Sequence, residues 1–237
     1  MVIDKTQIKK RPLVKQIFSE LLYGIRFFTI DQVIGIFYNF PVPLDNYTKR
    51  PVVLVPGMFG KTFTFYRLRK KLMKEGYPVY TVSLGLQLGD VIQKSEKVSK
   101  YLEDNNINDC YILGHSSGGI ISFLLLASGN KRVRRLIAFG SPFFGSYLAY
   151  LFPYIKQALQ VKPGSIFLNK LKSHYNLINN ATSVYSKFDQ ITIPTRKSRL
   201  YKSDDIFFPE IGHLNPIMSS TGVKFIQNLL NYYDLHE

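Results

Sequence analysis

The segment that most constrains this chain is residues 110–119, which reads CYILGHSSGG. An apolar run typical of a buried strand leads into the pattern Gly114-x-Ser116-x-Gly118, and a strongly apolar helical pattern follows. A serine at the tip of such a sharp turn has strained backbone angles, and the crowded turn leaves no room for a Cβ two residues before or after it. Because Ser116 has glycine at both positions, we predict that Ser116 is a nucleophile.

Ser117 is a weaker candidate, because the residue two positions before it is His115. Its backbone N–H is instead predicted to stabilise an oxyanion, since it lies at the start of the next helix. A glycine- and serine-rich turn that merely joins a strand to a helix is the alternative. That alternative does not explain residues 51–60, PVVLVPGMFG, where a second buried strand ends in a glycine-containing loop suited to another oxyanion donor.

From residue 51 onward, short β-branched runs alternate with longer helical patterns. This alternation predicts an α/β fold in which helices cover both faces of a mostly parallel central sheet. The predicted strands are residues 52–55, 79–84, 110–113, 133–139, 182–185 and 199–202, and the predicted helices are residues 63–74, 91–103, 118–127 and 223–232.

Two regions depart from this alternation. In residues 8–44, apolar side chains recur at helical spacing, which predicts an amphipathic helix within an N-terminal extension, residues 1–50. Residues 146–180 separate two predicted strands and are rich in aromatic and aliphatic side chains. Because this insertion is too long for a plain connection, we predict that it forms a helical cap on the main domain, residues 51–237.

The composition narrows the class of protein. The chain has 237 residues, 46% of them hydrophobic, which is enough to bury a large core. A single cysteine, Cys110, excludes an internal disulfide and a cysteine-rich metal site. The sequence shows no run of 18 apolar residues, so no transmembrane helix is predicted. No ordinary signal peptide is predicted either. The net charge of +15 favours acidic partners, but no nucleic-acid-binding motif accompanies it, so no nucleic-acid partner is expected.

A serine nucleophile needs an imidazole to accept its proton and a carboxylate to orient that imidazole. Among the four histidines, His115 adjoins the serine and is expected to be structural, His174 lies in the predicted cap, and His236 is the penultimate residue. His213 remains. It lies in a loop between the last predicted strand and the last predicted helix, and we predict that it is the base.

Asp189 is the favoured acid, because it follows a predicted strand and precedes a turn marked by Pro194. Asp204, Asp205 and Glu210 are its rivals, since all three lie near the last predicted strand or the histidine loop. An ordinary solvated turn carboxylate is the alternative for Asp189 itself.

These motifs together resemble the α/β-hydrolase superfamily and, within it, the small bacterial lipases and esterases. The resemblance runs from about residue 51 to residue 230. In that superfamily the acid and then the histidine follow the serine along the chain, which matches Ser116, Asp189 and His213. The resemblance also places an aspartate after a Tyr-Ser pair, and it places the histidine in a Gly-His-Leu stretch, as here.

The resemblance assigns a second oxyanion donor. The stretch Pro56-Gly57-Met58 corresponds to the family's loop after its first buried strand, so the backbone N–H of Met58 is the implied donor, with Phe59 the neighbouring alternative. The implied activity is cleavage of carboxylic esters through an acyl-enzyme on Ser116, without a metal or an organic cofactor. An acyltransferase or thioesterase would use the same residues. A catalytically silent binding protein of this fold is the alternative from another class.

The expected substrate is a small-molecule or lipid ester. Phe59, Phe143 and Phe144, with the aromatic insertion, suit an apolar pocket for an acyl chain longer than acetate, although plain core packing is the alternative for each ring. The N-terminal helix either contacts an anionic membrane, since Lys9, Lys10 and other cations flank its apolar stripe, or packs on the hydrolase core. The expected location is the cytoplasm, with peripheral membrane contact in the first case. The sequence predicts no oligomeric state.

Overall fold

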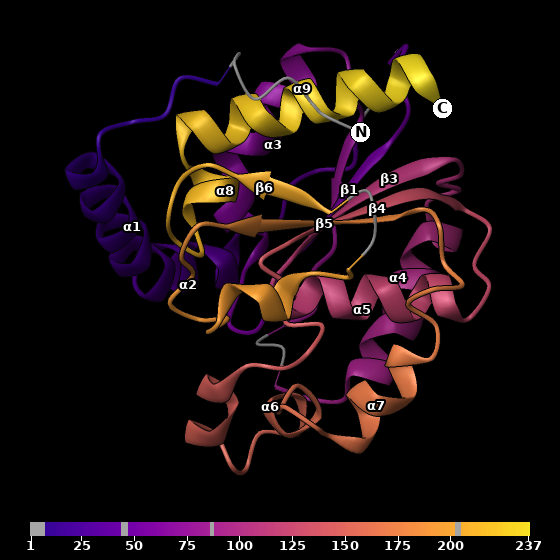
Figure 1. Ribbon diagram of the computed structural model, residues 1–237. Coiled ribbons are helices and arrows are strands. Elements are labelled where there is room, and N and C mark those ends of the chain that lie inside the picture. The colour runs from indigo at the N-terminus through magenta and orange to yellow at the C-terminus, as the bar shows by residue number, and fades with distance from the viewer. Residues whose placement is uncertain (1–7, 44–46, 86–87, 202–204) are drawn as a thin grey trace.

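Six parallel strands form one sheet in the computed structural model, which describes residues 8–43, 47–85, 88–201 and 205–237 (Figure 1). The strands lie in the order β2-β1-β3-β4-β5-β6. Their bounds are β1 Val52–Val55, β2 Val79–Thr81, β3 Cys110–His115, β4 Val133–Phe139, β5 Ala181–Ser186 and β6 Ile206–Phe208. Every neighbouring pair is parallel, so the predicted α/β fold is confirmed.

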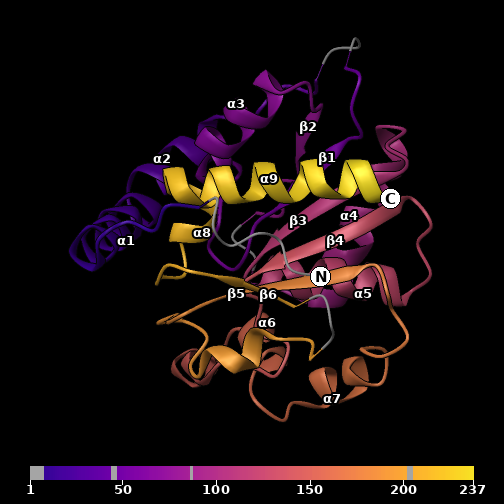
Figure 2. The same ribbon diagram turned by 45° about the horizontal axis from the view of Figure 1, so that its top comes forward.

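Helices cover both faces of the sheet, with α3 and α9 on one side and α4 and α5 on the other (Figures 1 and 2). Val52 and Leu54 pack into the core under the first pair, whereas Val53 and Val55 pack into the core under the second. Strands buried on both faces contain continuous β-branched and aliphatic runs, which is why the sequence revealed them. The helix bounds are α3 Tyr66–Lys74, α4 Val91–Asp104, α5 Ser117–Ala127 and α9 Ser220–His236.

The order of the strands reverses at β1, which pairs with β2 on one side and β3 on the other. In an open parallel sheet, a crevice forms at the carboxyl ends of the strands where the order reverses. The loop after β1 and the turn after β3 flank this crevice. The fold therefore places residues 56–60 beside Ser116.

The predicted strand at residues 199–202, whose last residue lies outside the described part of the chain, is wrong. This segment wraps around the carboxylate of Asp205, which accepts hydrogen bonds from the backbone N–H groups of Leu200 and Tyr201 at 3.1 and 2.7 Å. Tyr201 has a φ of 57°, which a strand does not accommodate. The edge strand is β6, which starts one residue after Asp205.

The insertion at residues 146–180 contains helical elements, as predicted for the cap. They are the 3₁₀ helix η3 Tyr147–Leu151, α6 Lys156–Gln160 and α7 Ile166–Lys172. Two leucines of α7 are buried in the same core as α4 and α5. A separate small cluster, formed by Ala149, Ala158 and Val161, packs against Met58. The insertion therefore contacts the loop after β1.

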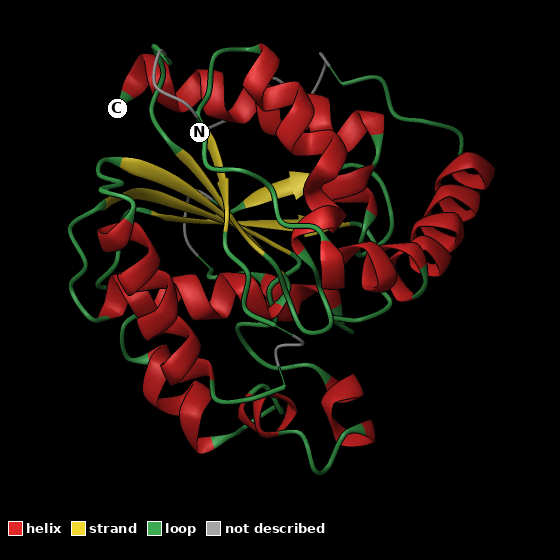
Figure 3. Ribbon diagram, turned by 180° about the vertical axis from the view of Figure 1, so that it is seen from behind, coloured by secondary structure: helices red, strands yellow, loops and turns green. Residues whose placement is uncertain are grey.

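The N-terminal segment forms two helices, α1 Leu13–Phe28 and α2 Ile30–Phe37, where the sequence predicted one. Figure 3 shows them at the periphery of the molecule. Their buried residues include polar Gln16 and Asp31, whereas the apolar stripe faces solvent. Its side chains are 46 to 85% exposed: Leu13, Val14, Ile17, Phe18, Leu21, Leu22, Ile25, Phe28, Ile30, Val33, Ile36 and Phe37.

This orientation is the reverse of the one that an amphipathic surface helix usually adopts. The helix does pack on the body of the protein, through polar Gln16 and Glu20 and through Phe27, which is buried in the core. Its apolar stripe stays exposed among the described residues. Within that same part of the chain, every helix is too short or too polar to cross a membrane.

Candidate active site

Ser116 lies at the junction of β3 and α5. Its φ of 55° and ψ of −130° place a non-glycine residue in a sparsely populated backbone region, and such strain often marks functional sites. The backbone N–H of Ser116 donates to the carbonyl of Phe139 in neighbouring β4 at 2.8 Å. The turn is thereby fixed to the sheet, and its half-buried serine is presented at the crevice.

The two glycines that flank Ser116 are required by close approach. A Cβ on Gly114 would lie 2.6 Å from the Cα of Gly119, and one on Gly118 would lie 2.7 Å from the carbonyl oxygen of Pro56. Both distances are shorter than real Cβ contacts allow. The turn therefore packs directly on the backbone of the loop after β1.

Asp189 follows β5, and His213 lies in the loop after β6. The Nδ1 atom of His213 is 2.8 Å from Oδ2 of Asp189, and both side chains are buried. The other carboxylate oxygen, Oδ1, accepts hydrogen bonds from the backbone N–H groups of Ile191 and Thr192 at 2.8 and 2.9 Å. One carboxylate thus orients the imidazole and closes its own loop.

Burial alone would lower the pKa of His213 and raise the pKa of Asp189, because both charged forms lose contact with water. The attraction and hydrogen bond between the two groups outweigh burial, so the pKa of His213 is raised and that of Asp189 is lowered. The negative charge of Glu20 also raises the pKa of His213. An ionised carboxylate only accepts hydrogen bonds, so Nδ1 of His213 carries the proton between them.

Ser116 and His213 line one cavity of about 270 Å³, together with His115. Within the described residues, the Ser116 hydroxyl makes no hydrogen bond to His213. Catalytic hydrogen bonds are often long without substrate and tighten in the complex. The remaining lining residues are mostly apolar: Gly24, Phe27, Phe28, Met58, Phe59, Leu148, Phe152, Gln190, Ile191 and Leu214.

His115 also lines this cavity. Its Nε2 is 3.0 Å from the carbonyl oxygen of His213, and the two rings lie 4.6 Å apart. Burial and then the charge of His213 lower the pKa of His115 to about 3, so His115 is neutral at pH 7. Because a carbonyl only accepts, Nε2 of His115 is the donor, and His115 supports the backbone of His213.

The other candidates for base and acid are placed elsewhere. Neither His174 nor His236 lines the cavity. Glu210 forms an ion pair with an arginine of the N-terminal segment, and Asp205 closes the turn before β6. Asp204 lies outside the described residues.

The two predicted oxyanion donors lie side by side. The N–H of Met58 donates to Oγ of Ser117 at 2.9 Å. The same Oγ accepts a hydrogen bond from Nε2 of Gln157 at 2.6 Å, and Oε1 of Gln157 accepts one from Lys94 at 2.7 Å. Burial, with a smaller effect from a neighbouring lysine, lowers the pKa of Lys94 to about 8. A buried polar chain therefore connects α4, the cap helix α6 and the loop after β1.

Of the three phenylalanines predicted to form the pocket, one lines the cavity of Ser116. Phe59 lines the cavity of Ser116, whereas Phe143 and Phe144 do not. Phe143 is buried in the core, where its carbonyl accepts a hydrogen bond from the hydroxyl of Tyr175 at 2.6 Å, and Phe144 also packs on that tyrosine ring. The other aromatic walls are Phe152, which belongs to the insertion that the sequence associated with the pocket, and Phe27 and Phe28 of α1, which it did not.

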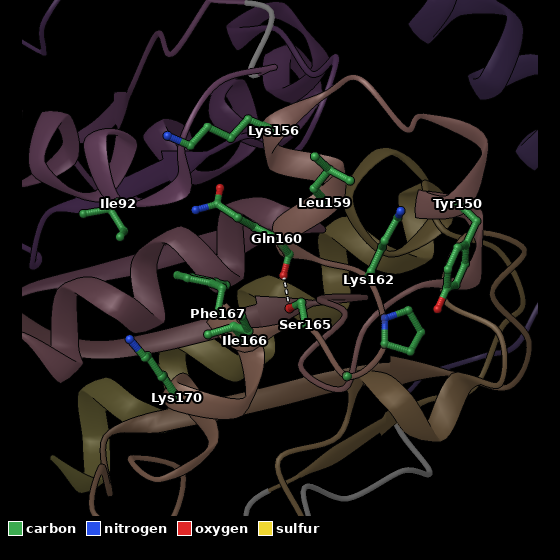
Figure 4. Close-up of a pocket in the computed structure, with 12 residues that line it drawn as sticks. Ile92, Tyr150, Lys156, Leu159, Gln160, Lys162, Ser165, Ile166, Phe167 and Lys170 are labelled. Carbon is green, nitrogen blue, oxygen red and sulfur yellow. Dashed lines mark hydrogen bonds between the residues drawn. The ribbon is translucent and has the colours of Figure 1, made fainter.

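A second cavity, of about 580 Å³, lies in the cap and is drawn in Figure 4. It shares no lining residue with the cavity of Ser116, and its charged side chains are Lys156, Lys162 and Lys170. Ser165 and Gln160 are joined by a hydrogen bond at its centre (Figure 4). Across the described residues, no three acidic, histidine or cysteine side chains are grouped to hold a metal ion.

Sequence comparison finds relatives of known class. A profile described as the alpha/beta hydrolase family matches residues 51–150. A triacylglycerol lipase from Burkholderia plantarii is 24% identical over 201 residues, which cover 76% of this chain and 54% of the relative. The chain therefore spans about half the length of that lipase.

Solved structures share the fold. The mature form of a Bacillus licheniformis lipase matches with a TM-score of 0.64 at 17% identity, over 81% of this chain and 96% of that one. A monoacylglycerol lipase from Paleococcus ferrophilus matches with a TM-score of 0.59 at 14% identity, over 79% of this chain and 95% of that one. At these identities the likeness concerns the fold.

The buried contact between Asp189 and His213 predicts a change in titration. Asp189→Asn removes the negative charge that raises the pKa of His213 and leaves burial, which lowers it. We therefore expect the pKa of His213 to fall below the ordinary histidine value of about 6.5. The measurement is an NMR titration of ¹⁵N-histidine-labelled protein. Asp104→Asn, which removes an exposed carboxylate, is the matched control, and an unchanged His213 titration in Asp189→Asn would contradict the contact.

Proposed function

Because this chain has the α/β-hydrolase fold and resembles lipases and esterases, we propose that it hydrolyses carboxylic esters through an acyl-enzyme on Ser116. One observation carries the proposal. Ser116, strained at the end of β3, lines the same cavity as His213, whose Nδ1 lies 2.8 Å from the buried carboxylate of Asp189. This arrangement supports the roles of Ser116 as nucleophile, His213 as base and Asp189 as orienting acid.

In this mechanism, Oγ of Ser116 attacks the ester carbonyl while Nε2 of His213 accepts the hydroxyl proton. Asp189 holds the Nδ1–H and stabilises the imidazolium that forms. The carbonyl oxygen becomes an oxyanion, which accepts hydrogen bonds from the N–H groups of Ser117 and Met58. For this step the Met58 N–H exchanges its partner, from Oγ of Ser117 to the substrate oxygen.

The tetrahedral intermediate then collapses, and the C–O bond to the alcohol breaks. His213 gives its proton to the departing alcohol, which leaves the acyl group on Ser116. A water molecule repeats the sequence as nucleophile, releases the carboxylic acid and restores the Ser116 hydroxyl. An acyltransferase would replace this water with another acceptor. A thioesterase would release a thiol in place of the alcohol.

The residues that line the cavity suit an apolar acyl group. Phe27 and Phe28 of α1, Phe59 after β1 and Phe152 of the insertion line it, and the polar side chains are the histidines, Ser116 and Gln190. Apolar walls with few polar groups are typical of ligand pockets. We expect an ester with an acyl chain longer than acetate.

Covalent labelling tests the nucleophile. A fluorophosphonate probe should label the wild-type protein, because it reacts with a serine activated by a neighbouring base. Ser116→Ala should lose the label completely. Ser128→Ala, which changes an exposed serine just after α5, should keep it, since that change leaves the nucleophile and its surroundings in place. If the probe labels Ser116→Ala, the proposal is contradicted. If it does not label the wild-type protein under native conditions, the proposal is also contradicted, and a catalytically silent binding protein is favoured.

Ester chain length tests the cavity. Among p-nitrophenyl esters of two to sixteen carbons, kcat/KM should be higher for a medium or long chain than for acetate. Phe59→Ala should lower kcat/KM for the preferred chain by about tenfold, the low end of what one apolar contact contributes to specificity. Phe144→Ala is the matched control, because Phe144 lies outside the cavity. Highest activity on acetate would exclude an acyl pocket.

The exposed surface of α1 and α2 supports peripheral contact with an anionic membrane. Exposed apolar patches of this kind mark interaction surfaces. Each exposed charged side chain in residues 8–43 is a lysine: Lys9, Lys10 and Lys15. Both acidic side chains of the segment, Glu20 and Asp31, are engaged by the protein. An apolar face with cations beside it suits anionic lipid.

The cavity of Ser116 adjoins this face. Phe28 belongs to the exposed stripe and also lines the cavity, as does Gly24 on the same helix. A lipid ester in a membrane bound by α1 would therefore enter the cavity beside the surface that holds the protein. The cytoplasmic location expected from the sequence stays a prediction.

Vesicle binding tests this surface. The full chain should sediment with vesicles of phosphatidylglycerol and phosphatidylcholine, and less so at high salt, which screens the lysines. Phe18→Ser with Leu22→Ser removes two side chains of the apolar stripe that lie outside the cavity. Vesicle binding by this double variant should weaken by at least about tenfold, because burying each such side chain contributes about 1.5–3 kcal/mol. Leu177→Ser with Leu235→Ser, which changes two more strongly exposed leucines elsewhere on the protein, is the control. Equal losses in both double variants would rule out a dedicated surface.

A further inference from the structure

We propose that Glu20 of α1 is a positioning residue for His213, so that the N-terminal helix is part of the proposed active site; the inference rests on the role proposed for His213. Oε1 of Glu20 accepts hydrogen bonds from the backbone N–H groups of His213 and Leu214 at 2.7 and 2.8 Å. Oε2 accepts one from Asn215 at 2.8 Å. Three successive N–H groups therefore converge on one carboxylate that comes from 193 to 195 residues away.

The surroundings of Glu20 are built to receive this carboxylate. A side chain at Gly212 would overlap the Glu20 carboxylate, and Gly212 has a φ of 108°, a conformation that favours glycine. Nε2 of Gln190 also donates to Oε1 of Glu20 at 2.6 Å. Because Gln190 adjoins Asp189, Glu20 contacts both the histidine loop and the acid loop.

Neighbouring residues of the N-terminal segment extend this contact. Gln16 lies one turn before Glu20 on the same face of the helix, and its Oε1 accepts the backbone N–H of Ile211 at 3.0 Å. Arg11 donates to both carboxylate oxygens of Glu210, from Nε at 3.0 Å and from Nη2 at 2.6 Å. The loop from residue 210 to residue 215 is therefore held along its length by α1 and by Arg11, which lies two residues before that helix.

A carboxylate suits this position better than a neutral side chain. A carboxylate only accepts hydrogen bonds, and all three backbone groups that face it are donors. It also places a negative charge beside a buried imidazole. The titratable groups that face His213 are Asp189, which is hydrogen-bonded to it, the neutral His115 and Glu20. Burial lowers the pKa of His213, and the two carboxylates raise it.

The test is Glu20→Gln in the full-length protein. Glutamine keeps one acceptor oxygen but presents an NH₂ group to one of the three donors, and it removes the charge. We expect the titration midpoint of His213, followed by NMR of ¹⁵N-labelled histidine, to move to lower pH. The rate of fluorophosphonate labelling at its high-pH plateau should fall by up to about a hundredfold, as expected when a catalytic base is displaced by about 1 Å. The midpoint of the labelling profile should move in the same direction as the NMR midpoint.

Glu103→Gln is the matched control, because it makes the same chemical change at an exposed glutamate of α4. It should leave both midpoints and the plateau rate unchanged. A purely structural role for Glu20 would lower the amount of folded protein without moving the His213 midpoint. A folded Glu20→Gln protein with the wild-type midpoint and plateau rate therefore overturns the inference.

A second measurement needs no variant. The backbone amides of His213, Leu214 and Asn215 should exchange slowly with deuterium in the wild-type protein, because Glu20 accepts all three. Free exchange of these amides would overturn the inference even if Glu20→Gln fails to fold. Both NMR readouts are independent of ester hydrolysis. If the wild-type protein resists labelling but the midpoint shift and the slow exchange are found, the proposed function fails and the contact stands.

Discussion

The hydrogen bond between Asp189 and His213 joins two loops, which contacts with three other segments of the chain hold in place. Neither residue lies in a strand or a helix, so each must be held by its loop. The Asp189 loop is closed by its own carboxylate and by Thr192, whose hydroxyl donates to the carbonyl of Gly140 after β4. The backbone of His213 is held from one side by Glu20 and from the other by His115. A buried carboxylate such as that of Asp189 is tolerated only with such complete hydrogen bonding.

Much of the fold could be read from the sequence, because its signals are local. Strands buried on both faces have β-branched runs, and the turn around Ser116 requires glycines at two fixed positions. The order of Ser116, Asp189 and His213 along the chain likewise needs no knowledge of contacts. The structure brings these three residues to the carboxyl edge of one sheet, which is where parallel topology places such loops.

The features that the sequence could not predict depend on contacts that no local sequence pattern reveals. Residues 199–201 had the composition of a strand, but the N–H groups of Leu200 and Tyr201 donate to the carboxylate of Asp205. Phe143 and Phe144 come soon after a strand that leads to the site, but both rings pack against Tyr175 and neither lines the cavity. The role of Glu20 had no local signal, because a single acid between apolar residues is common on a wet helix face. Its partners lie almost 200 residues away.

The contacts between α1 and the histidine loop also bear on how the chain assembles during synthesis. The hydrogen bonds of Arg11, Gln16 and Glu20 to this loop span 193 to 199 residues. At about 5 to 20 residues per second, a ribosome needs roughly 10 to 40 s to make that length of chain. During this interval the polar face of α1 lacks its partners in the histidine loop, and its apolar face is exposed. Helix α1 is therefore made well before the loop that fixes it, and the nascent chain carries an exposed apolar helix until the histidine loop has been made.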